Sequence, residues 1–272
     1  MELQTKNHAG IFVSVAKQNV SYPSHGNDYC FAIEKNSFWF NHRNNVIKEI
    51  LLKFPYANNF ADIGGGNGYQ ANFIRNNFPE KEVFLIEPGY EGCINARKYG
   101  LENVYNIPFQ EFDFKSNHIS GIGLFDVVEH IENDVDFLTE IASCCDKGTN
   151  IYITVPAHNS LWSDIDNYSG HYRRYNSKMI EILAKKTDLK LLYNGYFFSY
   201  LTLPVYLIRS MPYKIMGKRD SKVILEKSSK NHKSGTLTKG LVNLLNNMEL
   251  TALRNLKKIP LGGSCIAVFQ VQ

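Results

Sequence analysis

The sequence predicts an α/β fold in which helices cover both faces of a mostly parallel sheet. Through the middle of the chain, short apolar runs rich in β-branched and aromatic residues alternate with amphipathic segments, and Gly, Pro or Asp bounds each run. The 272 residues are 44% hydrophobic and 21% charged, which is the composition of an ordinary globular protein. Strands and helices that alternate in this way form parallel sheets buried between helices.

The expected elements follow one another in order along the chain. Seven strands are expected, at Phe60–Ile63, Val83–Ile86, Val104–Ile107, Ile122–Phe125, Asn150–Val155, Leu189–Tyr193 and Cys265–Val271. Apolar residues recur at helical spacing between several of these strands. Helices are therefore expected at Gly68–Asn77, Asp134–Cys145 and Ser177–Lys186.

Two regions fall outside this alternation. Residues 1–54 hold an aromatic cluster and an amphipathic helix, so we expect an N-terminal cap before a core of residues 55–193 and 264–272. Residues 194–263 are too many for a simple loop and end in a helical stripe, so we expect a helical insertion that forms a lid or an interface. Its apolar stretch, Tyr196–Ile208, is shorter than the roughly 20 residues of a membrane span.

The positive charge is concentrated in this insertion. The chain carries +4 overall, but residues 205–240 carry +7 and the remainder −3. Such a segment is either a solvated surface or a contact with anionic lipid or a phosphorylated substrate, and the small total gives no reason to expect nucleic acid. We see no secretory signal, and five cysteines without paired spacing indicate reduced thiols. We therefore expect a cytoplasmic protein, with peripheral attachment to the inner membrane face as a further expectation.

A glycine turn after the first strand is the strongest functional signal. FADIGGGNGYQANFI places Gly64, Gly66 and Gly68 between a buried strand and a helix, where positive φ and close backbone approach are needed. Asp62 precedes the turn, and Glu87 ends the next strand, where a carboxylate can accept hydrogen bonds from both ribose hydroxyls. The combination indicates a nucleoside cofactor. The alternative is a tight turn beside a surface carboxylate.

These segments resemble the class I S-adenosylmethionine-dependent methyltransferases. The matches are DIGGGNG (62–68), IEP (86–88), FDVVEHI (125–131) and GGSCIAVFQ (262–270). The resemblance implies a Rossmann-like sheet of seven strands with the last one antiparallel. It also implies that Asp62 and the glycine loop hold the methionine part, that Glu87 holds the ribose, and that Phe109 and Gln110 flank the adenine, although VYNIPFQEF lacks the family's usual Gly-Asp pair.

A more specific likeness is to methyltransferases that carry FWFxxRN before the core and LWSxxDxxxGHxRRY after the fifth strand, here Phe38–Asn44 and Leu161–Tyr175. In the later segment, Asp166 could orient His171 as a base, and Trp162, Arg173 and Arg174 could bind substrate. The alternative is a salt-bridged loop that closes the fold.

Three further groups have open interpretations. Asp126, Glu129 and His130 share one face if their segment is helical, and they could transfer protons, brace the helix, or bind a metal as a similar triplet does in methyltransferases of quinone biosynthesis. Trp39 could cover the cofactor or belong to the core. Arg43 could reach the cofactor's carboxylate.

The resemblance implies S-adenosyl-L-methionine as cofactor and a small-molecule, sugar- or lipid-linked acceptor. Histidines and Asp126 are the candidate catalytic groups, which favours oxygen as the methylated atom. A divalent metal is conceivable but not expected, and the oligomeric state stays open. The competing interpretations are a non-catalytic S-adenosylmethionine-binding module and an NAD-dependent oxidoreductase, which shares the sheet and the glycine turn.

Overall fold

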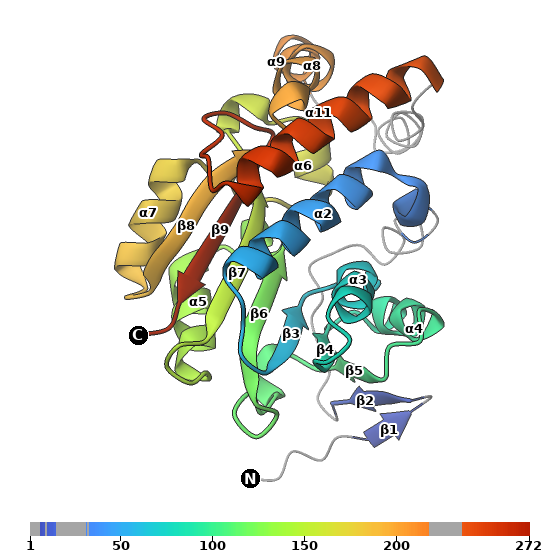
Figure 1. The fold of residues 1–272 in the computed structure, drawn as a ribbon, viewed down its shortest axis with the longest axis vertical. Helices are drawn as coiled ribbons and strands as arrows, with labels where there is room; N and C mark the ends of the chain where they lie inside the picture. The colour runs from blue at the N-terminus through green and yellow to red at the C-terminus, as the bar shows by residue number, and fades with distance from the viewer. Residues whose placement is uncertain (1–5, 9, 15–30, 32, 218–235) are drawn as a thin grey trace.

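A single sheet between two layers of helices organises the protein (Figure 1). The computed structural model describes residues 6–8, 10–14, 31, 33–217 and 236–272. Within these residues the strand order is β1-β2-β5-β4-β3-β6-β7-β9-β8. The strands are β1 Lys6–His8, β2 Ile11–Val13, β3 Asn59–Ile63, β4 Val83–Ile86, β5 Asn103–Asn106, β6 Ile119–Phe125, β7 Asn150–Pro156, β8 Lys190–Phe197 and β9 Ser264–Gln270.

Strands β3 to β9 are the seven strands that the sequence predicts. Neighbours among β3 to β7 pair in parallel, whereas β9 runs antiparallel between β7 and β8. The prediction of a mostly parallel sheet with an antiparallel last strand is confirmed. The N-terminal residues add two strands that were not predicted, since β1 pairs with β2, and β2 pairs with β5 at the sheet edge. Strands of three residues are too short to show an alternating pattern.

Helices pack on the two faces of the sheet, because successive side chains of each strand point to opposite faces. One hydrophobic cluster contains Ala61 and Ile63 of β3, and the other contains Phe60. The first cluster includes residues of α5 (Asp134–Ser143) and α7 (Ser177–Lys186). The second includes residues of α2 (Phe38–Lys53), α3 (Tyr69–Asn77), α4 (Tyr90–Lys98) and α11 (Thr236–Arg254).

Helices α2 and α11 lie together on one face and are joined by a buried carboxylate (Figure 1). Glu249 of α11 accepts hydrogen bonds from His42 Nε2 at 2.7 Å and from the backbone N–H groups of Phe198 and Ser199 at 2.8 Å each. Burial alone would raise the pKa of Glu249, but these donors outweigh it and hold the pKa below the usual range. The end of β8 is therefore fixed to both helices.

A short helical run follows β8 and ends at Met216, next to the end of the described stretch 33–217. It comprises η5 (Ser199–Leu201), α8 (Thr202–Val205), the π-helical η6 (Tyr206–Ser210) and α9 (Met211–Met216). Most of the predicted basic segment, from Lys218 to Lys233, lies outside the described residues. Among the helices that the structure describes, none combines the length and the apolar content that crossing a membrane requires. The division into cap, core and insertion remains a proposal.

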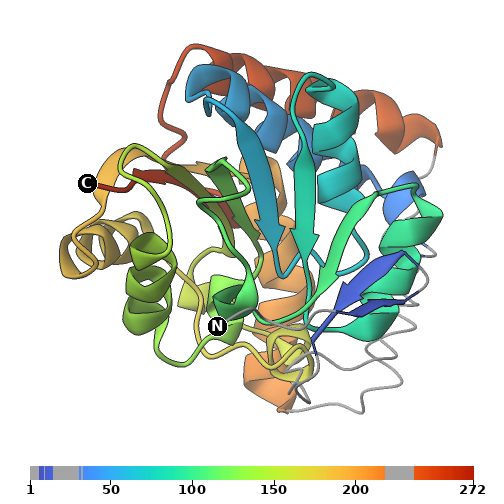
Figure 2. The same cartoon turned by 90° about the horizontal axis from the view of Figure 1, so that it is seen from below.

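The motifs converge on one edge of the sheet. Strands β3, β4, β6 and β7 are parallel, so the loops after all four leave from the same edge (Figure 2). The glycine turn, Glu87, the FDVVEHI segment and the loop after β7 are placed side by side in this way. Ligands of open α/β sheets bind beyond such an edge.

Candidate functional site

The glycine turn after β3 presents bare backbone. Gly64, Gly66 and Gly68 adopt φ values of 68°, 54° and 73°, in the left-handed region that favours glycine. A Cβ atom built on Gly66 would meet no protein atom within 4 Å, whereas one on Gly68 would lie 2.7 Å from the Cβ of Ala96. The space beside Gly66 is thus open, while Gly68 is required by the packing of α3 on α4.

Glu87 lies directly against this turn. One carboxylate oxygen accepts a hydrogen bond from the backbone N–H of Gly66 at 2.8 Å, and the other accepts from Gly89 at 2.6 Å. Asn106 donates to the Glu87 carbonyl at 3.0 Å, which fixes the backbone at the end of β4. Burial raises the pKa of Glu87, and the two N–H donors oppose this shift. The structure therefore brings two of the predicted cofactor-binding elements into contact.

Asp62 is a buried carboxylate with few donors. Its side chain is fully buried, and neither oxygen has a hydrogen-bond partner of normal geometry among the described residues. Burial raises its pKa to about 7, although the charge of Arg43 and the nearby N–H of Ala71 act in the opposite direction. A buried anion without sufficient donors is unfavourable. A cationic ligand group beside Asp62 would supply the missing donors and balance the charge of the carboxylate.

Arg43 reaches this region from α2. Its guanidinium pairs with Asp126 and lies 4.9 Å and 5.1 Å from the ring centres of Trp39 and Phe40. Trp39 in turn stacks on Phe198 with ring centres 5.3 Å apart. Trp39 thus packs against the end of β8, and Arg43 contributes positive charge near the carboxylates of the site.

The residues after β6 and β7 have unusual backbone conformations. Asp126 and His158 adopt φ values of 59° and 57°, which non-glycine residues rarely do. Asp126 also accepts a hydrogen bond from Thr154 Oγ1 at 3.0 Å. Strained positions that persist at one edge of a sheet often mark functional sites. At this edge, Asp126 pairs with Arg43, whereas the ring of His158 stacks on Tyr196 with ring centres 4.9 Å apart.

Beyond Asp126, a second cluster contains Glu129, His130 and His171. One potential ligand atom of each lies within 4.8 Å of the others, and the two imidazole rings meet edge to face at 4.7 Å. Burial and the neighbouring Asp126 raise the pKa of Glu129 well above its ordinary value. Burial, with the charge of His171, lowers the pKa of His130 to about 4, so His130 is neutral at pH 7. In the FDVVEHI segment, only Val128–His130 is helical, and Asp126 lies outside it and pairs with Arg43. The three potential ligands that the structure brings together are therefore Glu129, His130 and His171, not the predicted Asp126, Glu129 and His130.

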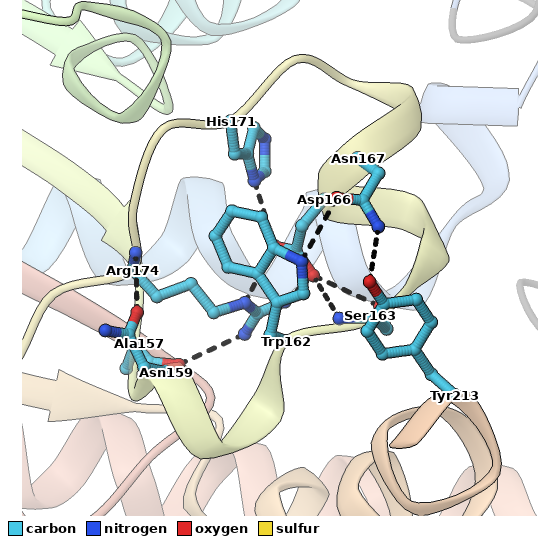
Figure 3. A network of polar contacts seen from close by, with 9 residues as sticks. All are labelled: Ala157, Asn159, Trp162, Ser163, Asp166, Asn167, His171, Arg174 and Tyr213. Atoms are coloured by element: carbon cyan, nitrogen blue, oxygen red, sulfur yellow. Dashed lines mark hydrogen bonds and ion pairs between the residues drawn. The ribbon is translucent and has the colours of Figure 1, made fainter. Parts of the chain in front are cut away.

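Asp166 of α6 (Asp164–Tyr168) organises the loop that contains His171 (Figure 3). One of its oxygens lies 2.9 Å from His171 Nδ1 and 2.7 Å from Arg174 Nε, and the other accepts from the backbone N–H of Ser163 at 2.8 Å. Burial alone would raise the pKa of Asp166, but the hydrogen bonds from His171 and Arg174 hold it below the usual range. Asp166 is therefore a charged anchor that orients His171.

The predicted substrate-binding side chains have other contacts. Arg174 is bound to Asp166 and to the Ala157 carbonyl, and Arg173 bridges Asp134 at 2.9 Å and the Ile131 carbonyl at 3.0 Å. Both arginines thus connect the loop to neighbouring segments, and their role in binding substrate stays a prediction. Trp162 is partly exposed and donates to Asn167, which in turn donates to Tyr213 of α9 at 3.0 Å (Figure 3).

Among the described residues, the side chain of Gln110 makes no recorded contact with the glycine turn. Its side chain is exposed and donates to Glu140 of α5 at 3.1 Å. Phe109, its neighbour, is buried and packs edge to face on Phe137 with ring centres 5.3 Å apart. The predicted contact of Phe109 and Gln110 with the adenine stays a prediction.

Sequence reasoning missed a buried acid near the glycine turn. Glu34 of η1 (Glu34–Asn36) is buried, accepts from the Tyr99 hydroxyl at 3.2 Å, and has its pKa raised to about 7, chiefly by burial. Asn67 within the turn accepts from Asn95 of α4 at 3.0 Å. No motif in the sequence identified Glu34, because its position depends on how the N-terminal region packs.

Comparisons with known proteins agree with this geometry. The family model described as "Methyltransferase domain" matches residues 39–194, a segment that includes Asp62, Glu87, Asp126 and His171. None of the curated proteins compared with this chain gives a significant match.

Solved structures with a similar fold include three methyltransferase structures of low sequence identity. Phosphoethanolamine N-methyltransferase 2 of Haemonchus contortus with S-adenosyl-L-methionine is 15% identical at a TM-score of 0.56, over 93% of this chain and 58% of the other. A putative methyltransferase with the Trm112 activator of Haloferax volcanii is 13% identical at 0.54, over 90% and 97%. The plantazolicin methyltransferase BpumL is 15% identical at 0.52, over 92% and 89%.

These solved structures support the fold alone, and this chain spans only 58% of the length of the Haemonchus enzyme. The family model carries the assignment, because it matches more than half of the chain and includes the glycine turn. The predicted resemblance to methyltransferases is thereby confirmed, and the chain belongs to the family described as "Methyltransferase domain".

Proposed function

We propose that this protein transfers a methyl group from S-adenosyl-L-methionine to an oxygen of a small-molecule, sugar- or lipid-linked acceptor. Two groups of residues at the same edge of the sheet support this. The turn around Gly66, with Asp62 and Glu87, forms the donor side, and the Asp166–His171 pair forms the acceptor side. Solved structures of similar fold contain S-adenosyl-L-methionine in one case and S-adenosylhomocysteine in another.

The residues on the donor side fit this cofactor chemically. A carboxylate has about four lone-pair sites, so Glu87 can accept from ribose hydroxyls while it holds Gly66 and Gly89. Asp62 would receive the cationic amino group of the methionine part, and Arg43 its carboxylate. The backbone of Gly64, Gly66 and Gly68 would lie along the ligand. The bound cofactor supplies a methyl group activated by a sulfonium centre.

On the acceptor side, His171 would act as the base. Its Nδ1 is held by Asp166, so a proton on Nδ1 leaves Nε2 as the acceptor of a hydroxyl proton. That proton would pass to Nε2 as the acceptor oxygen takes up the methyl group that the cofactor supplies. A base placed in this way typically accelerates a reaction by about 10²–10⁴. Asp126 and the neutral His130 would line the space between donor and acceptor.

The observation that carries this proposal is the contact between Glu87 and the glycine turn. Calorimetry with S-adenosyl-L-methionine tests it, using Glu87→Ala and the exposed Glu91→Ala on α4 as a matched control. Loss of the charge-assisted hydrogen bonds to ribose should weaken binding about tenfold or more, because each contributes about 1.5–3 kcal/mol. Equal affinity of wild type and Glu87→Ala would contradict the proposal.

A specific observation favours a second candidate, a divalent ion held by Glu129, His130 and His171. The buried Glu129 Oε2 has no hydrogen-bond partner among the described residues, and Asp166 would orient His171 as a carboxylate commonly orients a metal-binding histidine. In that case His171 would help to hold the ion and would not serve as the base. Full activity after chelation, unchanged by added Mg²⁺, Mn²⁺ or Zn²⁺, would rule this candidate out.

A further inference from the structure

The helical run from Thr202 to Gly217, here called the helical arm, exposes an unusual amount of apolar surface. Leu203, Ile208 and Ile215 are 65%, 65% and 75% exposed, and Leu207 and Met211 are 46% and 40% exposed. These positions follow one another at steps of four, one, three and four residues, which keeps them on one side of a helix. Contiguous apolar patches on soluble proteins usually mark an interaction site.

The charge of the helical arm restricts the nature of the partner. Residues 202–217 contain Arg209 and Lys214 and no acidic residue. Lys214 is exposed, and its ammonium lies 5.3 Å from the ring centre of Tyr206 on the same arm. In the sequence, residues 218–235 continue this bias with six Lys or Arg against two acids. An apolar face accompanied by cations is the pattern of helices that lie in the interface of anionic membranes.

The inner side of the helical arm is attached to the acceptor side of the site. Tyr213 of α9 accepts a hydrogen bond from Asn167 at 3.0 Å, and Asn167 also accepts from Trp162 (Figure 3). η6 packs against η4 (Asn159–Leu161), which begins the same loop. A partner that binds the exposed apolar side of the helical arm, here called its outer face, is therefore held next to the loop that carries His171.

We propose that the outer face of the helical arm docks on the surface of a lipid bilayer that contains anionic lipids. The arm is too short to span a bilayer and suits a position parallel to its surface. A second copy of the chain fits less well, because a symmetric contact of this face would bring like charges together. Docking places the acceptor loop at the lipid headgroups, and this last clause rests on the proposed function.

Vesicle flotation tests the docking directly. We expect wild-type protein to float with phosphatidylcholine vesicles that contain phosphatidylglycerol, and to bind less as salt is raised. The double variant Ile208→Glu/Ile215→Glu should lose about tenfold in binding, since it places two anions on the inserting face. Ile182→Glu on α7, where the wild-type side chain is 42% exposed, is the matched control and should float like wild type.

Three results would overturn the proposal: no flotation of wild type, equal flotation of the double variant, or a wild-type dimer in sedimentation that the double variant converts to a monomer. Thermal unfolding shows whether the double variant is folded. Calorimetry with S-adenosyl-L-methionine, performed without vesicles, tests the proposed function separately. Flotation without cofactor binding would then leave docking standing and reject the methyl-transfer proposal.

Discussion

Two buried carboxylates at the sheet edge that carries the glycine turn differ in the number of hydrogen-bond donors around them. Asp166 receives hydrogen bonds from His171, Arg174 and Ser163, and its pKa is held below the usual range. Asp62 has no such set of donors, and burial raises its pKa to about 7. One charge is thus satisfied by the folded chain itself, whereas the other is suited to a ligand that brings positive charge.

Asp62→Asn should stabilise the ligand-free protein and weaken cofactor binding. The pKa of Asp62 is raised in the folded state, so its protonation favours the folded protein at low pH, and this contribution is lost as pH rises from 3.8 toward about 7. At pH 8 we expect the variant to gain about 1–2 kcal/mol in the free energy of unfolding by urea. Calorimetry with S-adenosyl-L-methionine should show weaker binding.

The exposed Asp146→Asn serves as the control for both measurements, and neither stability nor binding should change. A destabilised Asp62→Asn variant that binds the cofactor normally would contradict the role assigned to Asp62.

His171→Ala should lose turnover and keep cofactor binding. The imidazole is oriented by Asp166 in the loop after β7, whereas the glycine turn follows β3. Its removal should therefore affect the base and leave the cofactor-binding residues in place. We expect a fall of about 10²–10⁴ in the rate of methyl transfer from labelled S-adenosyl-L-methionine to a panel of phenolic, sugar and lipid-linked hydroxyls. Lys178→Ala on α7 is the control, and unchanged turnover in His171→Ala would remove this residue from the mechanism.

At the scale of elements, pairing across the sheet and between helices positions the site. β3 and β4 pair in register from Phe60–Val83 to Ile63–Ile86, which places Glu87 beside the glycine turn. α2 delivers Arg43, and α2 is held to α11 and to the end of β8 through Glu249. The orientation of Arg43 therefore depends on a buried contact between segments about 200 residues apart in sequence.

Glu249→Ala should destabilise the protein strongly. It removes the acceptor of hydrogen bonds from His42, Phe198 and Ser199, and leaves the buried donors of His42 and Phe198 without this partner. Each buried donor left without a partner typically costs about 1–3 kcal/mol, so urea unfolding should show a loss of about 2–6 kcal/mol. Asn247→Ala, exposed on the same helix, should cost under about 0.5 kcal/mol. A loss below about 1 kcal/mol for Glu249→Ala would show that α11 is held by other contacts.

Elements with strong local patterns could be predicted from the sequence, and those set by distant contacts could not. The limits of α7 agree with Ser177–Lys186, and each predicted core strand appears in the structure, because short apolar runs between turn residues identify strands. β1 and β2 were missed, since they are short and exist through pairing with β5. The Asp166–His171 contact was expected at short range, whereas the Arg43–Asp126 pair spans 83 residues and depends on the placement of α2.

At the scale of the whole molecule, both sides of the proposed reaction belong to one hydrogen-bonded sheet. The donor side follows β3 and β4, and the acceptor side follows β6 and β7. A ligand bound at this edge contacts loops that leave several strands, so it should stabilise the folded chain as a unit.

S-adenosyl-L-methionine at about a hundredfold excess over its Kd should raise the free energy of unfolding by about 2.7 kcal/mol. Scanning calorimetry of thermal unfolding measures this stabilisation as a rise in Tm. Glu87→Ala should abolish most of the rise, and NAD should produce none in wild type. A rise with NAD and none with S-adenosyl-L-methionine would favour the oxidoreductase interpretation.

The position of β9 has a consequence for biosynthesis. This strand lies between β7 and β8, yet it is translated after both, with 66 residues between the end of β8 and its own start. Until it emerges from the ribosome, the facing borders of β7 and β8 lack their partner and expose backbone groups that can recruit a foreign strand. The nascent chain therefore passes through an interval in which aggregation competes with the insertion of β9.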